Sequence, residues 1–213
     1  MIEVAVIDYG VGNLLSVSRA LEHCGARVTI TSDAAAILAS GRVVLPGVGA
    51  FTDGMAALRA HGLDGVVRQV AATGTPLLGI CLGMQMLLDE SEEFGVTTGL
   101  GLIPGRVVQI PTTTTTGEPH KIPHIGWNEL VLPARRDSWQ GGLLGGIDPG
   151  EAVYFVHSFM AEPAAPAHRL ADCHYGGIPI SAALQRDNVL GCQFHPEKSG
   201  DVGLRVLKNF LQP

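Results

Sequence analysis

The first half of the chain alternates short apolar runs with segments of helical periodicity. The apolar runs are rich in β-branched residues, and glycine or polar turns follow them. Strands that alternate with helices in this way form a parallel sheet whose two faces are covered by the helices. The expected buried strands are 2–7, 28–30, 43–45 and 77–80, and the expected helices are 14–23, capped by Asn13, 51–60, 63–72 and 82–90.

The second half changes character, because strand-like segments follow one another with few helices between them. Such segments favour antiparallel additions to the sheet. A threonine tract at 112–116 is expected to form an exposed loop or hairpin tip, and 202–211 a closing helix. We therefore expect one α/β domain over residues 1–213, with an open, mixed, mostly parallel sheet and helices on both faces. The strand-like segments are 106–110, 129–132, 152–156, 170–174, 180–185 and 189–194.

Composition excludes several classes of function. The 213 residues carry a net charge of −6 and no basic stripe, which argues against nucleic acid and anionic membranes as partners. The longest apolar stretch, 76–88, is shorter than the roughly 18 residues that a membrane-spanning helix needs. Four cysteines without a CxxC pair argue against a disulfide framework, so we expect a cytoplasmic protein. Only 16% of residues are charged, which leaves apolar surface for a partner.

The sharpest chemical signal is the segment Gly79-Ile80-Cys81-Leu82-Gly83, between an apolar strand and a helical pattern. It has the form of a nucleophile elbow with cysteine in place of serine. The glycines would relieve clashes in a strained turn, and the start of the helix would favour a thiolate at Cys81. The backbone N–H of Leu82 would be free to bind a developing oxyanion. A buried structural cysteine beside glycines is the alternative interpretation.

A second signal is His195-Pro196-Glu197, which follows the strand-like segment 189–194. His195 and Glu197 are two residues apart, so in an extended backbone their side chains project to the same side. Glu197 would then orient the imidazole while His195 accepts the thiol proton. Together with the cysteine elbow, this pair indicates acyl transfer through a thioester.

Pro46-Gly47-Val48-Gly49 follows another expected strand, and its backbone N–H groups would complete an oxyanion hole over the elbow. Without Cys81 this segment would be read as a plain strand-to-helix turn. His120 and His124 have the spacing of a helical metal pair, but Pro123 argues against a helix there. We therefore expect no metal and no cofactor.

These motifs resemble those of the class I (triad) glutamine amidotransferases, and the resemblance covers essentially the whole chain. The cysteine elbow and the His-Pro-Glu segment place the chain in that class. The segments Pro-His-Ile-Gly-Trp-Asn at 123–128 and Tyr-Phe-Val-His-Ser-Phe at 154–159 point more narrowly to the glutaminase subunits of imidazole glycerol phosphate synthases. Phe159 is a departure, since this family more often has tyrosine there. Further matching segments are 8–14, 45–51, 79–85 and 193–199.

The resemblance implies that Cys81 attacks the side-chain amide of glutamine, that His195 shuttles the proton and that Glu197 orients His195. It also implies that the Gly47–Val48 peptide acts as a switch. By the same resemblance, the oxyanion hole comes from Val48, Gly49 and Leu82, the substrate positions are Gly49, Gln85, Glu93, His157, Ser158 and Phe159, and the partner-facing positions are Asn13, Trp127, Tyr154 and Lys198.

The implied partner is a (β/α)₈-barrel cyclase, which would receive ammonia and make imidazole glycerol phosphate and aminoimidazole carboxamide ribotide in histidine biosynthesis. Glutamine hydrolysis would be weak until this partner of the heterodimer binds its ligand. Three alternatives are the glutaminase subunit of another synthase, a stand-alone cysteine hydrolase, and a non-catalytic scaffold of the same fold. The Gly-Trp-Asn block disfavours the first, and retention of Cys81, His195 and Glu197 disfavours the last.

Overall fold

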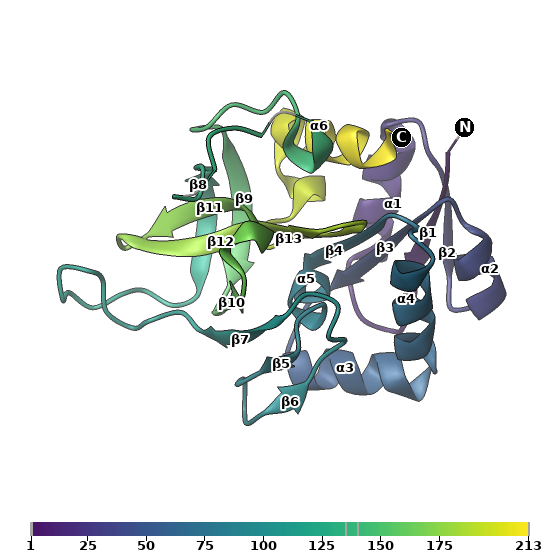
Figure 1. The fold of residues 1–213 in the computed structure, drawn as a ribbon, viewed down its shortest axis with the longest axis horizontal. Coiled ribbons are helices and arrows are strands. Elements are labelled where there is room, and N and C mark those ends of the chain that lie inside the picture. The colour runs from purple at the N-terminus through teal and green to yellow at the C-terminus, as the bar shows by residue number, and fades with distance from the viewer. Residues whose placement is uncertain (1, 135, 140, 213) are drawn as a thin grey trace.

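The computed structural model describes residues 2–134, 136–139 and 141–212. Its centre is a seven-stranded sheet (Figure 1), in which five strands pair in parallel and two further strands extend one edge through antiparallel pairings. The expected mixed, mostly parallel sheet is thus confirmed. The strand order is β11 (Arg169–Tyr175), β12 (Ile178–Arg186), β13 (Val189–Cys192), β4 (Leu77–Cys81), β3 (Arg42–Gly47), β1 (Glu3–Ile7) and β2 (Arg27–Thr31).

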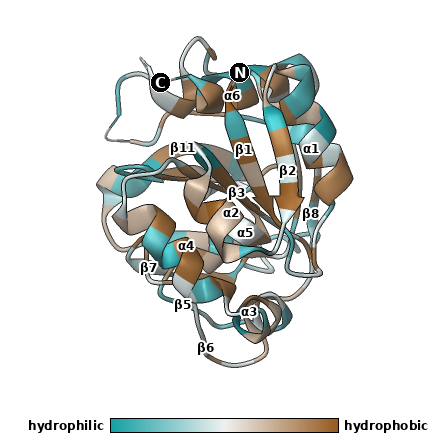
Figure 2. Ribbon diagram, turned by 90° about the vertical axis from the view of Figure 1, so that its right-hand side faces the viewer, coloured by the Kyte–Doolittle hydropathy of each residue, from teal (hydrophilic) through white to brown (hydrophobic). Residues whose placement is uncertain are grey.

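Helices cover both faces of this sheet, and β1 shows why. Val4 and Val6 belong to one buried apolar cluster, whereas Ala5 and Ile7, on the opposite face, belong to another. Figure 2 shows the central strands largely in the hydrophobic colour, as sheets with two covered faces require. The first cluster is covered by α1 (Leu14–His23) and α6 (Gly200–Leu211), and the second by α2 (Ala34–Ala39), α3 (Phe51–Ala60), α4 (Leu63–Ala72) and α5 (Leu82–Met86).

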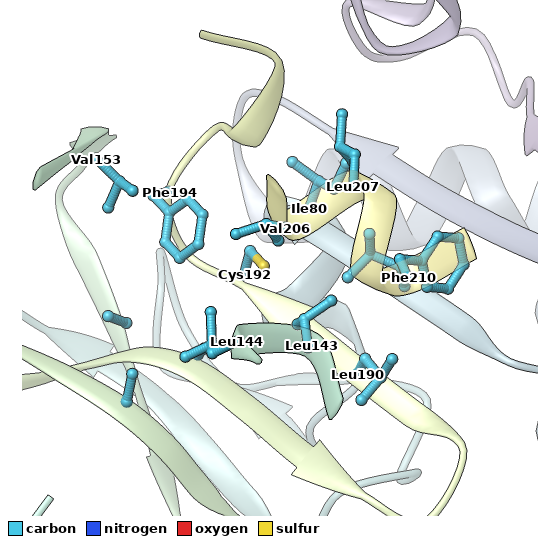
Figure 3. Packing of buried hydrophobic residues seen from close by; sticks show 14 of the residues in the cluster. Ile80, Leu143, Leu144, Val153, Leu190, Cys192, Phe194, Val206, Leu207 and Phe210 are labelled. Carbon is cyan, nitrogen blue, oxygen red and sulfur yellow. The ribbon is translucent and has the colours of Figure 1, made fainter. Parts of the chain in front are cut away.

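The first cluster continues beyond the sheet into the second half of the chain. Figure 3 shows Leu144, Phe194 and Val206 around Cys192, so this thiol lies among apolar side chains. Burial raises the pKa of the Cys192 thiol, with a smaller contribution from the charge of Glu197. Cys192 is therefore a small apolar residue of the core.

Two smaller sheets lie beside the main one, and they hold the second-half strands that do not join it. The tract at 112–116 lies on a mostly exposed loop that projects from the body (Figure 1), closed by a bridge between Thr113 and Pro119. This confirms the expected hairpin tip. One sheet has the order β10 (Phe159–Pro163), β7 (Gly105–Gln109), β5 (Glu90–Ser91), β6 (Thr97–Thr98), and the other pairs β8 (His124–Glu129) with β9 (Ala152–His157).

Helices α1, α3 and α4 begin and end at the expected residues. The helix expected over 82–90 is wrong in length, because α5 ends at Met86 and Glu90–Ser91 pairs with β7 instead. The strand expected at 129–132 is also misplaced: β8 ends at Glu129, where its pairing with β9 stops.

Two other expectations are wrong. Asn13 stands at the N-cap position of α1, but its side chain makes no capping hydrogen bond among the described residues. Strand β2, expected to be buried, is the edge strand of the main sheet and is partly exposed. None of the helices in the described ranges is long and apolar enough to cross a membrane.

Candidate active site

Parallel strands bring four distant segments of the chain to one edge of the main sheet. At their carboxyl ends, β1 leads into Tyr9, β3 ends at Gly47, β4 ends at Cys81, and β13 leads into His195. The register of β3 and β4 sets Gly47 opposite Cys81. This is the edge at which open parallel sheets place their sites.

Cys81 occupies a strained turn between β4 and α5, as the elbow motif predicts. Its φ of 55° and ψ of −112° are unusual for a residue with a side chain. A Cβ on Gly79 would lie 2.7 Å from the backbone of Gly83, and a Cβ on Gly83 would overlap the carbonyl oxygen of Leu45. Both flanking glycines are therefore sterically required, and they hold the cysteine at the sheet edge.

His195 and Glu197 form a buried pair. Nδ1 of His195 lies 2.8 Å from Oε1 of Glu197, and both side chains are almost fully buried. Burial by itself lowers the pKa of His195, but the side chains of Cys81 and Glu197 raise it more, to about 9. The two neighbouring side chains therefore favour the protonated form of the ring.

The second ring nitrogen of His195, Nε2, is buried and without a hydrogen-bond partner among the described residues. Cys81 is close enough to affect the pKa of His195, yet its sulfur does not meet hydrogen-bond geometry with Nε2. An unpartnered N–H beside a thiol is suited to exchange a proton with a substrate group that binds next to both side chains.

A cavity of about 390 Å³ is lined by Cys81 and His195. This volume accommodates a small molecule rather than a large one. Every residue predicted for the oxyanion hole or for substrate binding lines it, and so do Pro123 and Val156, which belong to the matching segments but have no predicted role. The predicted lining residues are Val48, Gly49, Leu82, Gln85, Glu93, His157, Ser158 and Phe159.

Tyr9 fixes the loop that follows β3. Its side chain is fully buried, and its hydroxyl donates a hydrogen bond of 2.7 Å to the carbonyl oxygen of Pro46. A Cβ on Gly47 would lie 2.7 Å from that hydroxyl, so glycine is needed there. Burial, and to a smaller extent the charge of Cys81, raises the pKa of Tyr9 and keeps its hydroxyl a donor. Sequence reasoning missed Tyr9, because its role depends on contact with a strand 37 residues away.

Glu93 is held at the cavity wall by a helix terminus. Its Oε2 accepts a hydrogen bond of 2.7 Å from the backbone N–H of Phe51, the first residue of α3. The N-cap residue of this helix, Ala50, has no side-chain acceptor, so Glu93 supplies the cap. One carboxylate oxygen is used in this bond.

The carbonyl oxygen of Phe159 accepts two hydrogen bonds inside the site. Gln85 Nε2 donates at 3.0 Å, and His157 Nδ1 lies at 2.8 Å. Both contacts are to the backbone, so a phenylalanine at position 159 keeps them.

His157 is part of a buried, uncharged chain. With Nδ1–H given to Phe159, Nε2 of His157 must accept from Nδ1 of His124, 3.0 Å away. Nε2 of His124 then accepts from the amide of Asn128 at 3.3 Å. Burial lowers the pKa of His157 to about 3 and that of His124 to about 4, so both rings stay neutral. The side chain of His157 thus braces the cavity wall.

The four positions predicted to face a partner lie on neighbouring elements. Trp127 and Tyr154 are cross-strand neighbours with ring centroids 6.2 Å apart, and Trp127 is 59% exposed. Lys198 is exposed, and Asn13 is half-buried at the start of α1. Sequence reasoning missed Ile125, 57% exposed two residues before Trp127 on the same strand face.

Comparison with known proteins shows what the chain is similar to. The family described as "Glutamine amidotransferase class-I" matches residues 5–212. "Imidazole glycerol phosphate synthase subunit HisH 1" of Legionella pneumophila (strain Lens) is 52% identical over 212 residues, with both chains fully covered. The corresponding subunit HisH of Geobacillus thermodenitrificans is 48% identical over 99% of this chain and 96% of its own.

Among solved structures, that of PurLQS from Thermotoga maritima shares the fold. Its TM-score is 0.74 at 19% identity, over 99% of this chain and 97% of the other. The family match spans nearly all of the chain. The chain therefore belongs to the class I glutamine amidotransferases.

Proposed function

We propose that this chain is the glutaminase subunit of an imidazole glycerol phosphate synthase. It hydrolyses glutamine to glutamate and ammonia and passes the ammonia to a cyclase subunit. The observation that carries the proposal is the cavity in which Cys81 and His195 meet Gln85 and Glu93, in a chain 52% identical over its full length to a subunit HisH.

The reaction begins with Cys81 as a thiolate beside the imidazolium of His195. The sulfur attacks the side-chain amide carbon of glutamine and forms a C–S bond, while the carbonyl oxygen becomes an oxyanion. The N–H of Leu82 has no partner within α5, because Leu82 is the first helical residue, so it is available to this oxyanion. The backbone of Val48 and Gly49 supplies the opposite side of the oxyanion hole.

Collapse of this intermediate requires a proton on the leaving nitrogen. His195 donates that proton from Nε2, and the C–N bond breaks. Ammonia departs, and a glutamyl thioester remains on Cys81. Water then attacks the thioester carbon and gives a proton to the neutral His195. The C–S bond breaks, glutamate leaves, and the thiolate–imidazolium pair is restored. Glu197 holds the ring through Nδ1 at both steps.

The substrate's remaining groups have matching partners in the cavity. Glu93 has a carboxylate oxygen besides the one that caps α3, and this charge suits the α-ammonium group of glutamine. Gln85 is fixed by the Phe159 carbonyl and faces the same cavity. This set of groups selects a small zwitterion with an amide side chain.

The cyclase is the partner that consumes the ammonia, and we infer that it is a (β/α)₈ barrel in a heterodimer with this chain. The exposed Trp127 and Ile125 and the cationic Lys198 are proposed as its contacts. We also place the reaction in the cytoplasm, which is compatible with free thiols at all four cysteines.

The test measures ammonia release from glutamine by this chain with and without the cyclase and the cyclase's nucleotide ligand. The proposal predicts weak release alone, strong release in the liganded complex, and none from Cys81→Ala. Equal release without the partner would indicate a stand-alone hydrolase. Release that Cys81→Ala leaves intact would contradict the mechanism.

A further inference from the structure

Gln193 is a buried polar residue beside the proposed site, and the mechanism above gives it no role. It follows β13, its side chain is fully buried, and its backbone N–H donates a hydrogen bond of 2.9 Å to the carbonyl oxygen of Ala182. This bond continues the pairing of β13 with β12 and fixes the position of the Cα atom of Gln193. The backbone of Gln193 is thus attached to the main sheet.

The side-chain amide of Gln193 connects two residues of the site. Its Oε1 accepts a hydrogen bond of 2.9 Å from Nε2 of Gln85. Its Nε2 donates to the sulfur of Cys81 at 3.7 Å. One buried amide therefore joins the proposed substrate-binding residue to the proposed nucleophile.

The orientation of this amide follows from the chemistry of its neighbours. The carbonyl oxygen of Phe159 can only accept, so the atom of Gln85 that contacts it must be the nitrogen. The same nitrogen contacts Gln193, so the atom of Gln193 on that side must be the oxygen. The N–H₂ group of Gln193 is then left facing the sulfur of Cys81.

We propose that Gln193 is a further catalytic residue, which donates a hydrogen bond to the Cys81 thiolate and fixes the position of Gln85 relative to that sulfur. This role rests on the proposed glutaminase function. An N–H donor stabilises an anionic acceptor more than a neutral one, and the effect is larger in a buried site. The bond is therefore strongest when the sulfur is charged, both before attack and when glutamate leaves.

The test compares Gln193→Met, which keeps the volume and removes both hydrogen bonds, with the wild-type chain. Cys81 reactivity is read without glutamine, as the rate of alkylation by iodoacetamide at that residue in the complex with the cyclase. We expect Gln193→Met to be alkylated roughly tenfold more slowly, and glutamine hydrolysis to show a higher KM and a lower kcat. Ser181→Ala, a buried substitution on β12, is the matched control and should alkylate at the wild-type rate.

Gln193→Glu adds a pH-dependent readout. A protonated carboxyl can donate to the sulfur, whereas a carboxylate cannot and repels the thiolate. The alkylation rate of Gln193→Glu relative to wild type should therefore fall as the pH rises. A folded Gln193→Met with the wild-type alkylation rate, or a Gln193→Glu ratio that is constant with pH, would overturn the proposal. If Gln193→Met does not fold, the Gln193→Glu ratio decides.

The two proposals fail separately. Were the wild-type complex to release no ammonia while the alkylation differences held, the glutaminase function would be wrong and the role of Gln193 at Cys81 would stand. If the wild-type complex released ammonia but the Gln193 substitutions left the alkylation rate of Cys81 unchanged, only the role of Gln193 would be wrong.

Discussion

The backbone N–H of His195 donates a hydrogen bond of 2.9 Å to the carbonyl oxygen of Tyr154. Ser199 closes the arrangement, since its Oγ accepts from the N–H of Tyr154 at 2.9 Å and donates to the carbonyl oxygen of His195 at 2.7 Å. Tyr154 lies opposite the exposed Trp127. Strand β9, which pairs with the strand of Trp127 and carries the predicted partner-facing Tyr154, therefore also holds the proposed proton-transfer residue.

Replacing Ser199 with alanine should lower kcat more than it affects glutamine binding. The change removes two hydrogen bonds and leaves the buried N–H of Tyr154 unsatisfied, at a cost of about 1–3 kcal/mol in the free energy of unfolding. His195 would then be held less firmly near Cys81. Steady-state kinetics and urea unfolding measure the two effects. Ser40→Ala, which removes a bond within the α2 segment far from the site, should leave kcat unchanged, and a kcat loss there would contradict the explanation.

Two glycine-to-alanine substitutions should have opposite effects on stability. Gly83→Ala places a Cβ on the carbonyl oxygen of Leu45, so we expect a loss of about 3 kcal/mol or more. Gly65→Ala lies within α4, where a Cβ meets nothing within 4 Å, and should raise the free energy of unfolding by up to about 1 kcal/mol. Chemical unfolding of both variants measures this. Equal effects would mean that the elbow is not sterically determined.

Acid should destabilise the protein through the pair His124 and His157. Their pKa values are lowered to about 4 and about 3, whereas in an unfolded chain histidine titrates near 6.5. Between pH 6.5 and 4 the unfolded chain binds protons that the folded chain does not, so stability is complete above 6.5 and is lost as the pH falls.

His195 acts in the opposite direction. Its pKa is raised to about 9, so its contribution to the free energy of unfolding is complete below pH 6.5 and is lost as the pH rises toward 9.

The variant His124→Phe tests the contribution of His124, because it keeps a ring beside Tyr175 and Phe155 but cannot titrate. The free energy of unfolding of this variant should depend less steeply on pH between 4 and 6.5. An unchanged slope would mean that His124 does not take up a proton on unfolding in that range.

Trp127→Ala should weaken the complex with the cyclase without destabilising the chain. Truncation of a tryptophan that is a hot spot of an interface costs about 2 kcal/mol or more, which corresponds to roughly a 30-fold rise in Kd. Isothermal titration with the cyclase measures it. Val96→Ala, which truncates an exposed apolar residue on the turn between β5 and β6, is the control and should bind normally. If both variants bound alike, the proposed contact surface would be wrong.

Local signals in the sequence predict the parts of the fold that depend on neighbours in the chain. The limits of α1, α3 and α4 follow from their own periodicity. The early end of α5 does not follow from periodicity, because Glu90–Ser91 pairs with β7. The limits of β8 depend on its pairing with β9. Pairing between distant strands is not encoded in local periodicity, so these boundaries could not be predicted.

The site also has parts that local sequence signals predict and parts that depend on contacts between distant segments. Cys81 and the pair His195 and Glu197 stand in compact motifs, and the cavity contains every substrate position that the resemblance implies. The roles of Tyr9 and Gln193 are missed, because each depends on side-chain contacts with remote segments of the chain. No spacing in the sequence brings such residues together, and only the sheet topology does.

The central claim, a glutamyl thioester on Cys81, is tested most directly by quenching the liganded complex with acid during turnover of glutamine and mapping adducts by peptide mass spectrometry. The account predicts a glutamyl adduct on the peptide that contains Cys81, and unmodified thiols at Cys24, Cys173 and Cys192. Glu197→Gln should slow both the formation and the hydrolysis of the adduct, because Glu197 holds His195 at both steps. Ammonia released at the full rate without any adduct on Cys81, or with an adduct on another cysteine, would contradict it.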